Sequence, residues 1–271
     1  MSDSAIPQGA ALLEALESGE LRVAVCSDDG VWSVRTEVKE AILEIFRTSE
    51  IVHMGNELRR ESYLRLELER PPFRDKDLLR VRSFTKRDGV RLVPGGSSVR
   101  RGAFLGDGVV CMPPMYVNVG AYVGARTMID SHALVGSCAQ IGSGVHLSAA
   151  AQIGGVLEPP GARPVIVEDD VFVGGNSGIY EGVLVRRGAV IGAGVILTAT
   201  TKLFDLVHER ELVGTRDAPL EVPAGAVVVP ATRPAAGAWA AERGLAVACA
   251  LIPKYRDERT AAATALEEAL R

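Results

Sequence analysis

The stretch that decides the fold reads YVNVGAYVGARTMIDSHALVGSCAQIGSGVHLSAAAQIG at positions 116–154. An aliphatic residue recurs at every sixth position, and after one break the same spacing continues to position 197. This ladder consists of Val117, Val123, Ile129, Val135, Ile141, Leu147 and Ile153, and then Val167, Val173, Ile179, Val185, Ile191 and Leu197. A fixed period of six is typical of a parallel β-helix. Three hexapeptides close one triangular coil, and each strand pairs with the strand in the next coil.

A small residue usually follows the aliphatic one, as Gly124, Gly136 and Gly142 do. We expect the aliphatic side chain to point into the coil and the small residue to lie at the corner. Glycine suits a corner because it tolerates backbone angles that other residues rarely adopt.

The segments outside the repeat predict two further units. Helical apolar spacing occurs at 8–18 and 37–47, and the turn Asp28-Asp29-Gly30 between two alternating segments indicates a hairpin. The fold class is therefore mainly β, with a mainly helical N-terminal domain over 1–96 and the β-helix over 97–230. Residues 231–271 form a C-terminal cap with a strand at 245–252 and a helix at 260–270, which would cover the strand edges of the last coil.

Two stretches interrupt the repeat. EPPGARP at 158–164 predicts a loop that leaves the coil, and the period fails over 203–221 before returning at Val222.

Composition narrows the class of protein. The chain has 271 residues, 47% of them hydrophobic, and a net charge of −4, which argues against a general nucleic-acid binder. No apolar run approaches the roughly 18 residues of a membrane span, and the N-terminus lacks the pattern of a secretion signal. The four cysteines show no CxxC spacing and are expected to be reduced and buried in a cytoplasmic protein.

Polar residues that break the repeat are candidates for chemistry. Asp130 follows Ile129, where a small residue is usual, and Glu168 and Glu181 are similar candidates, although an exposed acid at a corner is common. His146 could be a general base, but a packed histidine is the commoner role. A zinc site of three imidazoles is not expected, because the repeat offers only His132 and His146.

Several segments resemble one family of acyltransferases. YVNVGAYV (116–123), TMID (127–130), VGSCAQIG (135–142), VHLS (145–148) and IGGVLEP (153–159) are similar to the central part of the tetrahydrodipicolinate N-succinyltransferases of lysine and diaminopimelate synthesis. The likeness covers about residues 88–256. It implies a left-handed coil, an exception to the usual right-handed crossover, and a homotrimer with active sites between adjacent subunits. It also implies small-molecule substrates, with succinyl-CoA as co-substrate and no permanently bound cofactor.

The same resemblance suggests roles for individual residues. Arg91 matches the arginine that binds a substrate carboxylate, and Asp130 matches the aspartate that contacts the substrate amine and is proposed as base. A second acid is proposed in a family segment of the form S-E-x-x-E-G, which here reads SGIYEG at 177–182. Gly178 replaces the first glutamate and Glu181 matches the second. Either Glu181 serves instead, or Asp130 works alone.

The chemistry fits these groups, but it does not select the substrate. An amine loses a proton as it attacks a thioester, so a nearby carboxylate can act as base, and backbone N–H groups can stabilise the oxyanion. Arg100, Arg101 and Arg126 are further cations near the site in sequence. An acetyl-CoA-dependent N-acyltransferase of a related amino acid or amino sugar, and a scaffold without catalysis, stay open. No residue can be assigned to CoA.

Overall fold

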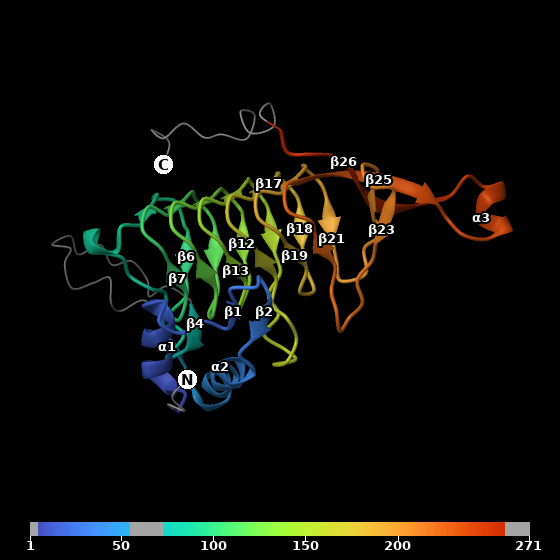
Figure 1. Cartoon of the computed structure of the whole chain (residues 1–271). Helices are drawn as coiled ribbons and strands as arrows, with labels where there is room; N and C mark the ends of the chain where they lie inside the picture. The colour runs from blue at the N-terminus through green and yellow to red at the C-terminus, as the bar shows by residue number, and fades with distance from the viewer. Residues whose placement is uncertain (1–4, 55–72, 258–271) are drawn as a thin grey trace.

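The computed structural model describes residues 5–54 and 73–257. Its body is a three-sided coil of two-residue strands, stacked along one axis as Figure 1 shows. Each coil contributes one strand to each of three parallel sheets, which we call face one, face two and face three in chain order. The hexapeptide ladder therefore predicted the β-helix correctly.

Each face is a single column of stacked strands. Face one contains β5 (Arg91–Leu92), β8 (Val110–Cys111), β11 (Met128–Ile129), β14 (His146–Leu147), β17 (Phe172–Val173) and β20 (Val190–Ile191). Face two contains β6 (Ser98–Val99), β9 (Tyr116–Val117), β12 (Leu134–Val135), β15 (Gln152–Ile153), β18 (Gly178–Ile179) and β21 (Ile196–Leu197). Face three contains β7 (Phe104–Leu105), β10 (Tyr122–Val123), β13 (Gln140–Ile141), β16 (Ile166–Val167), β19 (Leu184–Val185) and β24 (Glu221–Val222).

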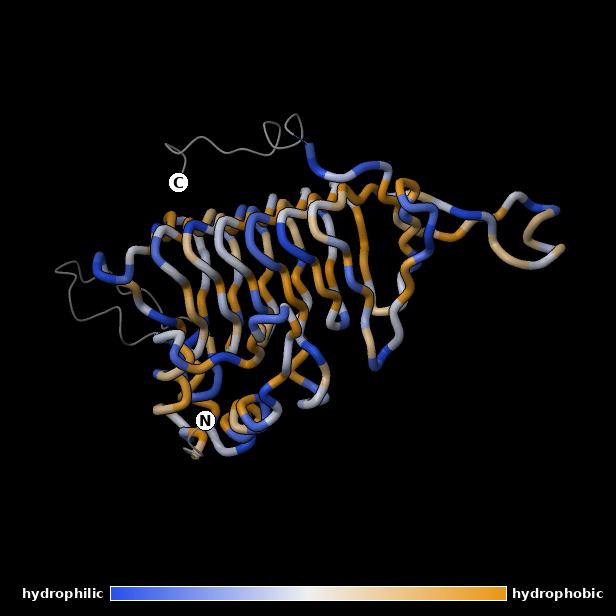
Figure 2. Tube along the Cα trace, in the orientation of Figure 1, coloured by the Kyte–Doolittle hydropathy of each residue, from blue (hydrophilic) through white to orange (hydrophobic). Residues whose placement is uncertain are grey.

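The second residue of each coil strand fills the interior. Val123, Ile141 and Val167, for example, are fully buried and stack in register on face three. Figure 2 shows the result as apolar stretches that recur from coil to coil. Burial of this aliphatic column is the main stabilising contribution to the coil, because apolar area removed from water contributes roughly 25 cal/mol per Å².

The glycines that follow the aliphatic residues have a different role from the one expected. A Cβ at Gly124 would lie 2.5 Å from the carbonyl carbon of Gly142 in the next coil, so the absence of a side chain permits close stacking. The left-handed backbone angles occur two positions later, for example at Arg126 (φ 56°) and His132 (φ 62°). The expectation of special φ values directly after the aliphatic residue was therefore wrong.

The N-terminal segment packs below the first coils (Figure 1). It contains α1 (Gly9–Glu17), β1 (Ala24–Cys26), β2 (Trp32–Val34), α2 (Thr36–Thr48), β3 (Ile51–His53), β4 (Arg74–Lys76) and the short 3₁₀ helix η2 (Lys86–Asp88). Both predicted helices and the β1–β2 hairpin are confirmed. The pairing of β3 with β4 adds strand structure to a segment predicted to be mainly helical. Leu13 and Ile42 from the two helices share an apolar cluster with Val119 and Cys138 of the coil.

The loop at 158–164 leaves the coil as predicted, and a lysine of α2 holds it. Lys39 is fully buried, and its Nζ donates to the carbonyl oxygens of Ala162 (2.9 Å) and Pro159 (3.3 Å). Burial lowers the pKa of Lys39. This contact ties the loop to the N-terminal segment.

The C-terminal segment extends face one beyond the last coil. β25 (Ala226–Pro234) pairs with β20 and with β26 (Ala246–Tyr255), which continues to β22 (Leu203–Asp205) and β23 (Arg210–Leu212). The strand predicted at 245–252 is confirmed as part of β26. In Figure 1 the β25–β26 hairpin projects past the coil and carries α3 (Ala238–Glu242) at its tip. The helix predicted at 260–270 lies outside the described residues. Among the helices of the described residues, none is long and apolar enough to span a membrane.

A buried acid fastens this segment. Asp205 accepts hydrogen bonds from Tyr255 Oη (2.8 Å) and Arg210 Nε (3.0 Å) and contacts His208 Nδ1 (2.9 Å). Burial opposes ionisation, but these hydrogen bonds outweigh it and hold the pKa of Asp205 well below its usual range.

Candidate active site

Asp130 lies at the corner that follows β11, where face one gives way to face two. Its backbone N–H donates to the Leu147 carbonyl in the next coil at 2.9 Å, which fixes the corner. Its Oδ1 accepts from the Ser131 backbone N–H at 2.7 Å. Oδ2 has no hydrogen-bond partner among the described residues, and the side chain is half-buried. The edge therefore presents one carboxylate whose Oδ1 is fixed by a hydrogen bond, while its Oδ2 is left as an unused acceptor.

Arg91 lies on face one, nearer than Asp130 to the N-terminal end of the coil. It pairs with Val110, which in turn pairs with Met128 of β11, so two strand steps separate it from the level of Asp130. At about 4.8 Å per step, this is roughly 10 Å, a separation that a small dicarboxylate with an attached amine can bridge. Arg91 is exposed.

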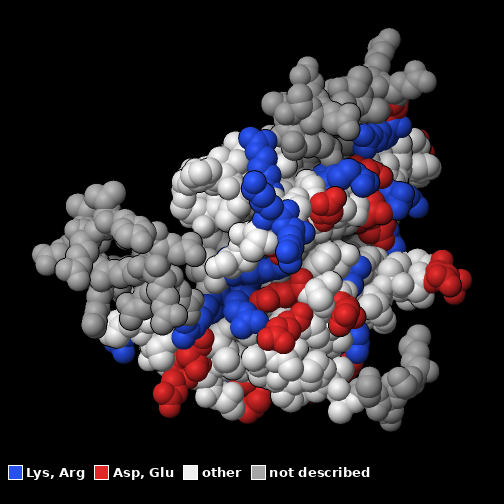
Figure 3. Space-filling model, turned by 90° about the vertical axis from the view of Figure 1, so that its left-hand side faces the viewer, with Lys and Arg blue, Asp and Glu red and all other residues white. Residues whose placement is uncertain are grey.

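Two of the other candidate cations are committed to ion pairs. Arg100 pairs with Asp75, and Arg101 Nε lies 3.0 Å from Glu17 Oε1. Figure 3 shows this end of the molecule, where a band of Lys and Arg side chains runs beside acidic ones. Arg100 and Arg101 therefore help to hold the N-terminal segment on the coil.

Glu181 lies at a different edge of the coil from Asp130. It follows β18 at the corner between faces two and three, with a left-handed φ of 53°. Its Oε2 accepts from the Ala199 backbone N–H at 3.1 Å. One chain therefore does not bring Glu181 and Asp130 together, and the Glu181 side chain serves as a cap for the next coil.

The space beside Gly178 is occupied by the ring of Tyr180. A Cβ at Gly178 would lie 2.7 Å from Tyr180 Cζ and 2.7 Å from its Oη, and a Cβ at Gly154 would lie 2.8 Å from its Cδ1. The ring thus lies flat on two glycines on the outside of face two. A side chain at position 178 and a ring at position 180 exclude each other in this arrangement. Sequence reasoning noticed Gly178 but missed Tyr180.

The other candidates have packing or anchoring contacts. His146 lies on face one with its ring edge against Phe172, at a centroid separation of 4.9 Å, and His132 is an exposed corner residue. Glu168 accepts from Trp32 Nε1 (3.0 Å), Arg186 Nη1 (3.0 Å) and the Arg187 backbone N–H (2.9 Å). Among the described residues no group of three or more His, Cys, Asp or Glu could hold a metal ion.

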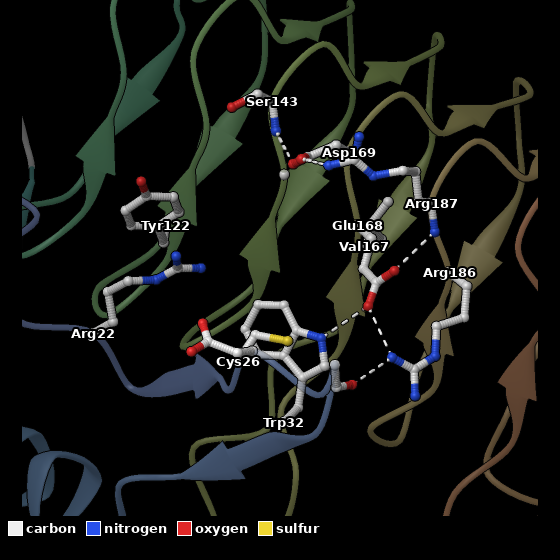
Figure 4. Close-up of a pocket in the computed structure, with 13 residues that line it drawn as sticks. Arg22, Cys26, Trp32, Tyr122, Ser143, Val167, Glu168, Asp169, Arg186 and Arg187 are labelled. Carbon is white, nitrogen blue, oxygen red and sulfur yellow. Dashed lines mark hydrogen bonds and ion pairs between the residues drawn. The ribbon is translucent and has the colours of Figure 1, made fainter.

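A cavity of about 570 Å³ opens between the β1–β2 hairpin and face three. Figure 4 shows Arg22 and Tyr122 on one side, Trp32 and Cys26 below, and Glu168 with Arg186 opposite. Arg22 Cζ lies 3.6 Å from the centroid of the Tyr122 ring. Burial lowers the pKa of Arg22 and raises that of Cys26. Nothing in the hexapeptide pattern signals this cavity, because it depends on where the hairpin docks.

Comparison with known proteins agrees with the architecture. A family model described as the tetrahydrodipicolinate N-succinyltransferase N-terminal region matches residues 9–48, and one described as the hexapeptide repeat of succinyl-transferase matches residues 164–199. A Campylobacter jejuni chain of known structure is 18% identical with a TM-score of 0.47, covering 90% of this chain and 61% of that chain.

Three curated relatives carry the name 2,3,4,5-tetrahydropyridine-2,6-dicarboxylate N-succinyltransferase. The Rhodopseudomonas palustris protein is 43% identical over 269 residues, covering 96% of this chain and 87% of its own. Those of Paramagnetospirillum magneticum and Polynucleobacter asymbioticus are 43% and 42% identical, each covering 96% of this chain and 88% of the relative. Similarity of this extent, together with the family repeat, shows that the chain belongs to the tetrahydrodipicolinate N-succinyltransferase family.

Proposed function

We propose that this chain transfers the succinyl group of succinyl-CoA to the amine of ring-opened tetrahydrodipicolinate, in lysine and diaminopimelate synthesis. The observation that carries the proposal is the 43% identity over 96% of the chain to a relative of that name. Thiol release from succinyl-CoA in the presence of tetrahydrodipicolinate tests it. Release with acetyl-CoA alone would favour the acetyltransferase alternative, and no release with either donor would favour a scaffold.

Asp130 is the proposed base of this reaction. Its Oδ2 could accept the proton that the amine loses as it attacks the thioester, while the Ser131 contact keeps Oδ1 fixed. Arg91 would hold a substrate carboxylate through charge-assisted hydrogen bonds. Backbone N–H groups at the corners would stabilise the tetrahedral oxyanion.

We propose Glu181 as a second catalytic residue only for the case in which several copies of the chain assemble. Its edge lies away from Asp130 within one chain, so a joint role requires adjacent subunits. The contact with Ala199 supports the simpler alternative, in which Asp130 works without a second carboxylate.

The remaining proposals concern the whole molecule. We infer a left-handed coil, domain limits at 96 and 230, a capping role for residues 231–271 and a homotrimer. Light scattering of the active enzyme tests the trimer, and a catalytically active monomer would contradict it. Cys111, Cys138 and Cys249 are buried as expected, whereas Cys26 is exposed, contrary to the expectation. The free thiol of Cys26 supports a cytoplasmic location, since an exposed thiol persists in a reducing compartment. Succinyl-CoA is the proposed co-substrate, without a permanently bound cofactor.

A further inference from the structure

The cavity beneath the β1–β2 hairpin is separate from the proposed acyl-transfer site. It opens on face three, whereas Asp130 lies at the edge between faces one and two. Both the N-terminal segment and the coil contribute walls, and ligand sites are frequent at such junctions. The walls are held by direct bonds, because Arg186 Nη1 donates to the Gly30 carbonyl of the hairpin turn at 2.9 Å. The cavity is therefore present before any ligand arrives.

Most charges that line the cavity already have partners. Glu168 accepts from three donors, and Arg186 bridges it to Glu221 at 3.0 and 2.9 Å. Asp169 accepts from the Ser143 backbone N–H at 2.8 Å and pairs with Arg187. These groups form a closed network on one side of the cavity (Figure 4).

Among the described residues, Arg22 is the only cation lining the cavity that is not in an ion pair with a carboxylate. Its Nε donates to Gln140 Oε1 at 3.1 Å, and its guanidinium lies over the Tyr122 ring. Its two Nη atoms make no hydrogen bond or ion pair to any residue in 5–54 or 73–257, and Figure 4 shows them directed into the cavity. A half-buried guanidinium without a carboxylate partner is costly to the folded state. An anion in the cavity would supply the missing acceptors in the bidentate geometry that guanidinium favours.

We propose that this cavity is a binding site for a small organic carboxylate, held by the Nη atoms of Arg22 with its apolar body against Trp32. The carboxylate group matches the single uncommitted cation. Asp28 also lines the cavity and is not in an ion pair with any described residue, so its charge disfavours a multiply charged anion such as phosphate more than a singly charged carboxylate. The Trp32 ring, whose Nε1 is tied to Glu168 at 3.0 Å, offers a fixed apolar surface for the rest of the ligand.

Tryptophan fluorescence can test this site directly. The chain has two tryptophans, and Trp239 is 64% exposed in α3 at the tip of the projecting hairpin. In the full-length Trp239→Phe variant, Trp32 is the sole reporter. We would titrate it with sodium hexanoate, with 1-hexanol as a neutral analogue and with inorganic phosphate, at constant ionic strength. Hexanoate should give a saturable change, with half-saturation at a concentration at least tenfold below that of either other probe.

Substitution of Arg22 supplies the second readout. Arg22→Gln should weaken hexanoate binding at least tenfold, and Arg47→Gln, at an exposed arginine paired with Glu44, should leave it within twofold. Arg22→Lys keeps the positive charge and the aliphatic part of the side chain but cannot make the bidentate contact of a guanidinium, so it should weaken hexanoate binding at least threefold. This variant keeps the test valid even if Arg22→Gln loosens the hairpin. Equal binding of hexanol, tighter binding of phosphate, or unchanged hexanoate binding in Arg22→Lys would overturn the proposal.

Discussion

The sharpest test of the proposed mechanism is Asp130→Asn. The corner depends on Oδ1, which accepts from the Ser131 backbone N–H at 2.7 Å. The asparagine carbonyl oxygen can accept the same bond, so we expect the free energy of unfolding to change by less than about 0.5 kcal/mol. The amide nitrogen replaces Oδ2, the oxygen proposed to take the proton. The substitution thus separates the chemistry of this carboxylate from its structural contact.

The expected effect on rate follows from the loss of that acceptor. A positioned general base contributes about 10²–10⁴ in rate, which corresponds to roughly 2.7–5.4 kcal/mol of activation free energy. We expect kcat for thiol release from succinyl-CoA to fall by that factor, with the circular dichroism spectrum and oligomeric mass unchanged. A kcat within threefold of the parent enzyme would refute the assignment of Asp130 as base.

Two parallel variants serve as controls for Asp130→Asn. In Glu181→Gln the amide oxygen can still accept from the Ala199 N–H, so a purely structural Glu181 predicts less than a threefold loss of kcat. A loss comparable with that of Asp130→Asn would instead make Glu181 a second catalytic residue across the subunit boundary. His146→Gln should stay near the parent rate, because His146 packs against Phe172.

Three further changes test other parts of the structure. Arg91→Ala should raise KM for the dicarboxylate about ten- to a hundredfold, because roughly 1.5–3 kcal/mol of charge-assisted contact is lost. KM for succinyl-CoA should stay constant. Steady-state kinetics with each substrate varied in turn test this, and an equal rise of both KM values would contradict the assignment of Arg91. Gly178→Ala should displace the Tyr180 ring and lower stability by about 1–3 kcal/mol, measured by urea unfolding, and an unchanged midpoint would argue against the ring position. Because the pKa of Asp205 is depressed in the folded state, its stabilisation is present above the ordinary aspartate pKa of about 3.9 and is lost as the pH falls below it. The Tm of Asp205→Asn should therefore lie below that of the parent at pH 7, and the gap should narrow steadily as the pH falls from about 4 toward 2. A difference independent of pH would contradict this.

The sequence was most informative where one residue determines its own position. An aliphatic residue at every sixth position marks a strand, shows which side chain points inward and assigns the strand to its coil. The repeat and the exceptional position of Asp130 could therefore be predicted. The separation of Asp130 from Glu181 could also have been predicted, because β18 is the seventh strand after β11 and seven is not a multiple of three. Counting strands would have placed the two acids on different edges.

Other features depend on contacts that no local pattern encodes. The pairing of β3 with β4 joins two three-residue strands more than twenty positions apart, and the Arg22 cavity exists only because the hairpin docks on face three. The role of Gly124 was misjudged for a similar reason, since the relevant neighbour is Gly142 in the next coil. Tyr180 was missed because a ring folded back over Gly178 and Gly154 looks in sequence like any outward residue.

The stacking register sets how many residues connect two paired strands of the coil. It therefore also determines how well the coil tolerates a longer connection. Tyr122 pairs with Gln140 eighteen residues later, whereas the loop at 158–164 makes the next step, from Gln140 to Ile166, one of 26 residues. The entropy of closing a chain segment grows only with the logarithm of its length, so the longer step costs about 0.3 kcal/mol more. Insertions into this loop, natural or engineered, can therefore change the surface beside the coil with little loss of stability, provided that the strands on either side keep their pairing.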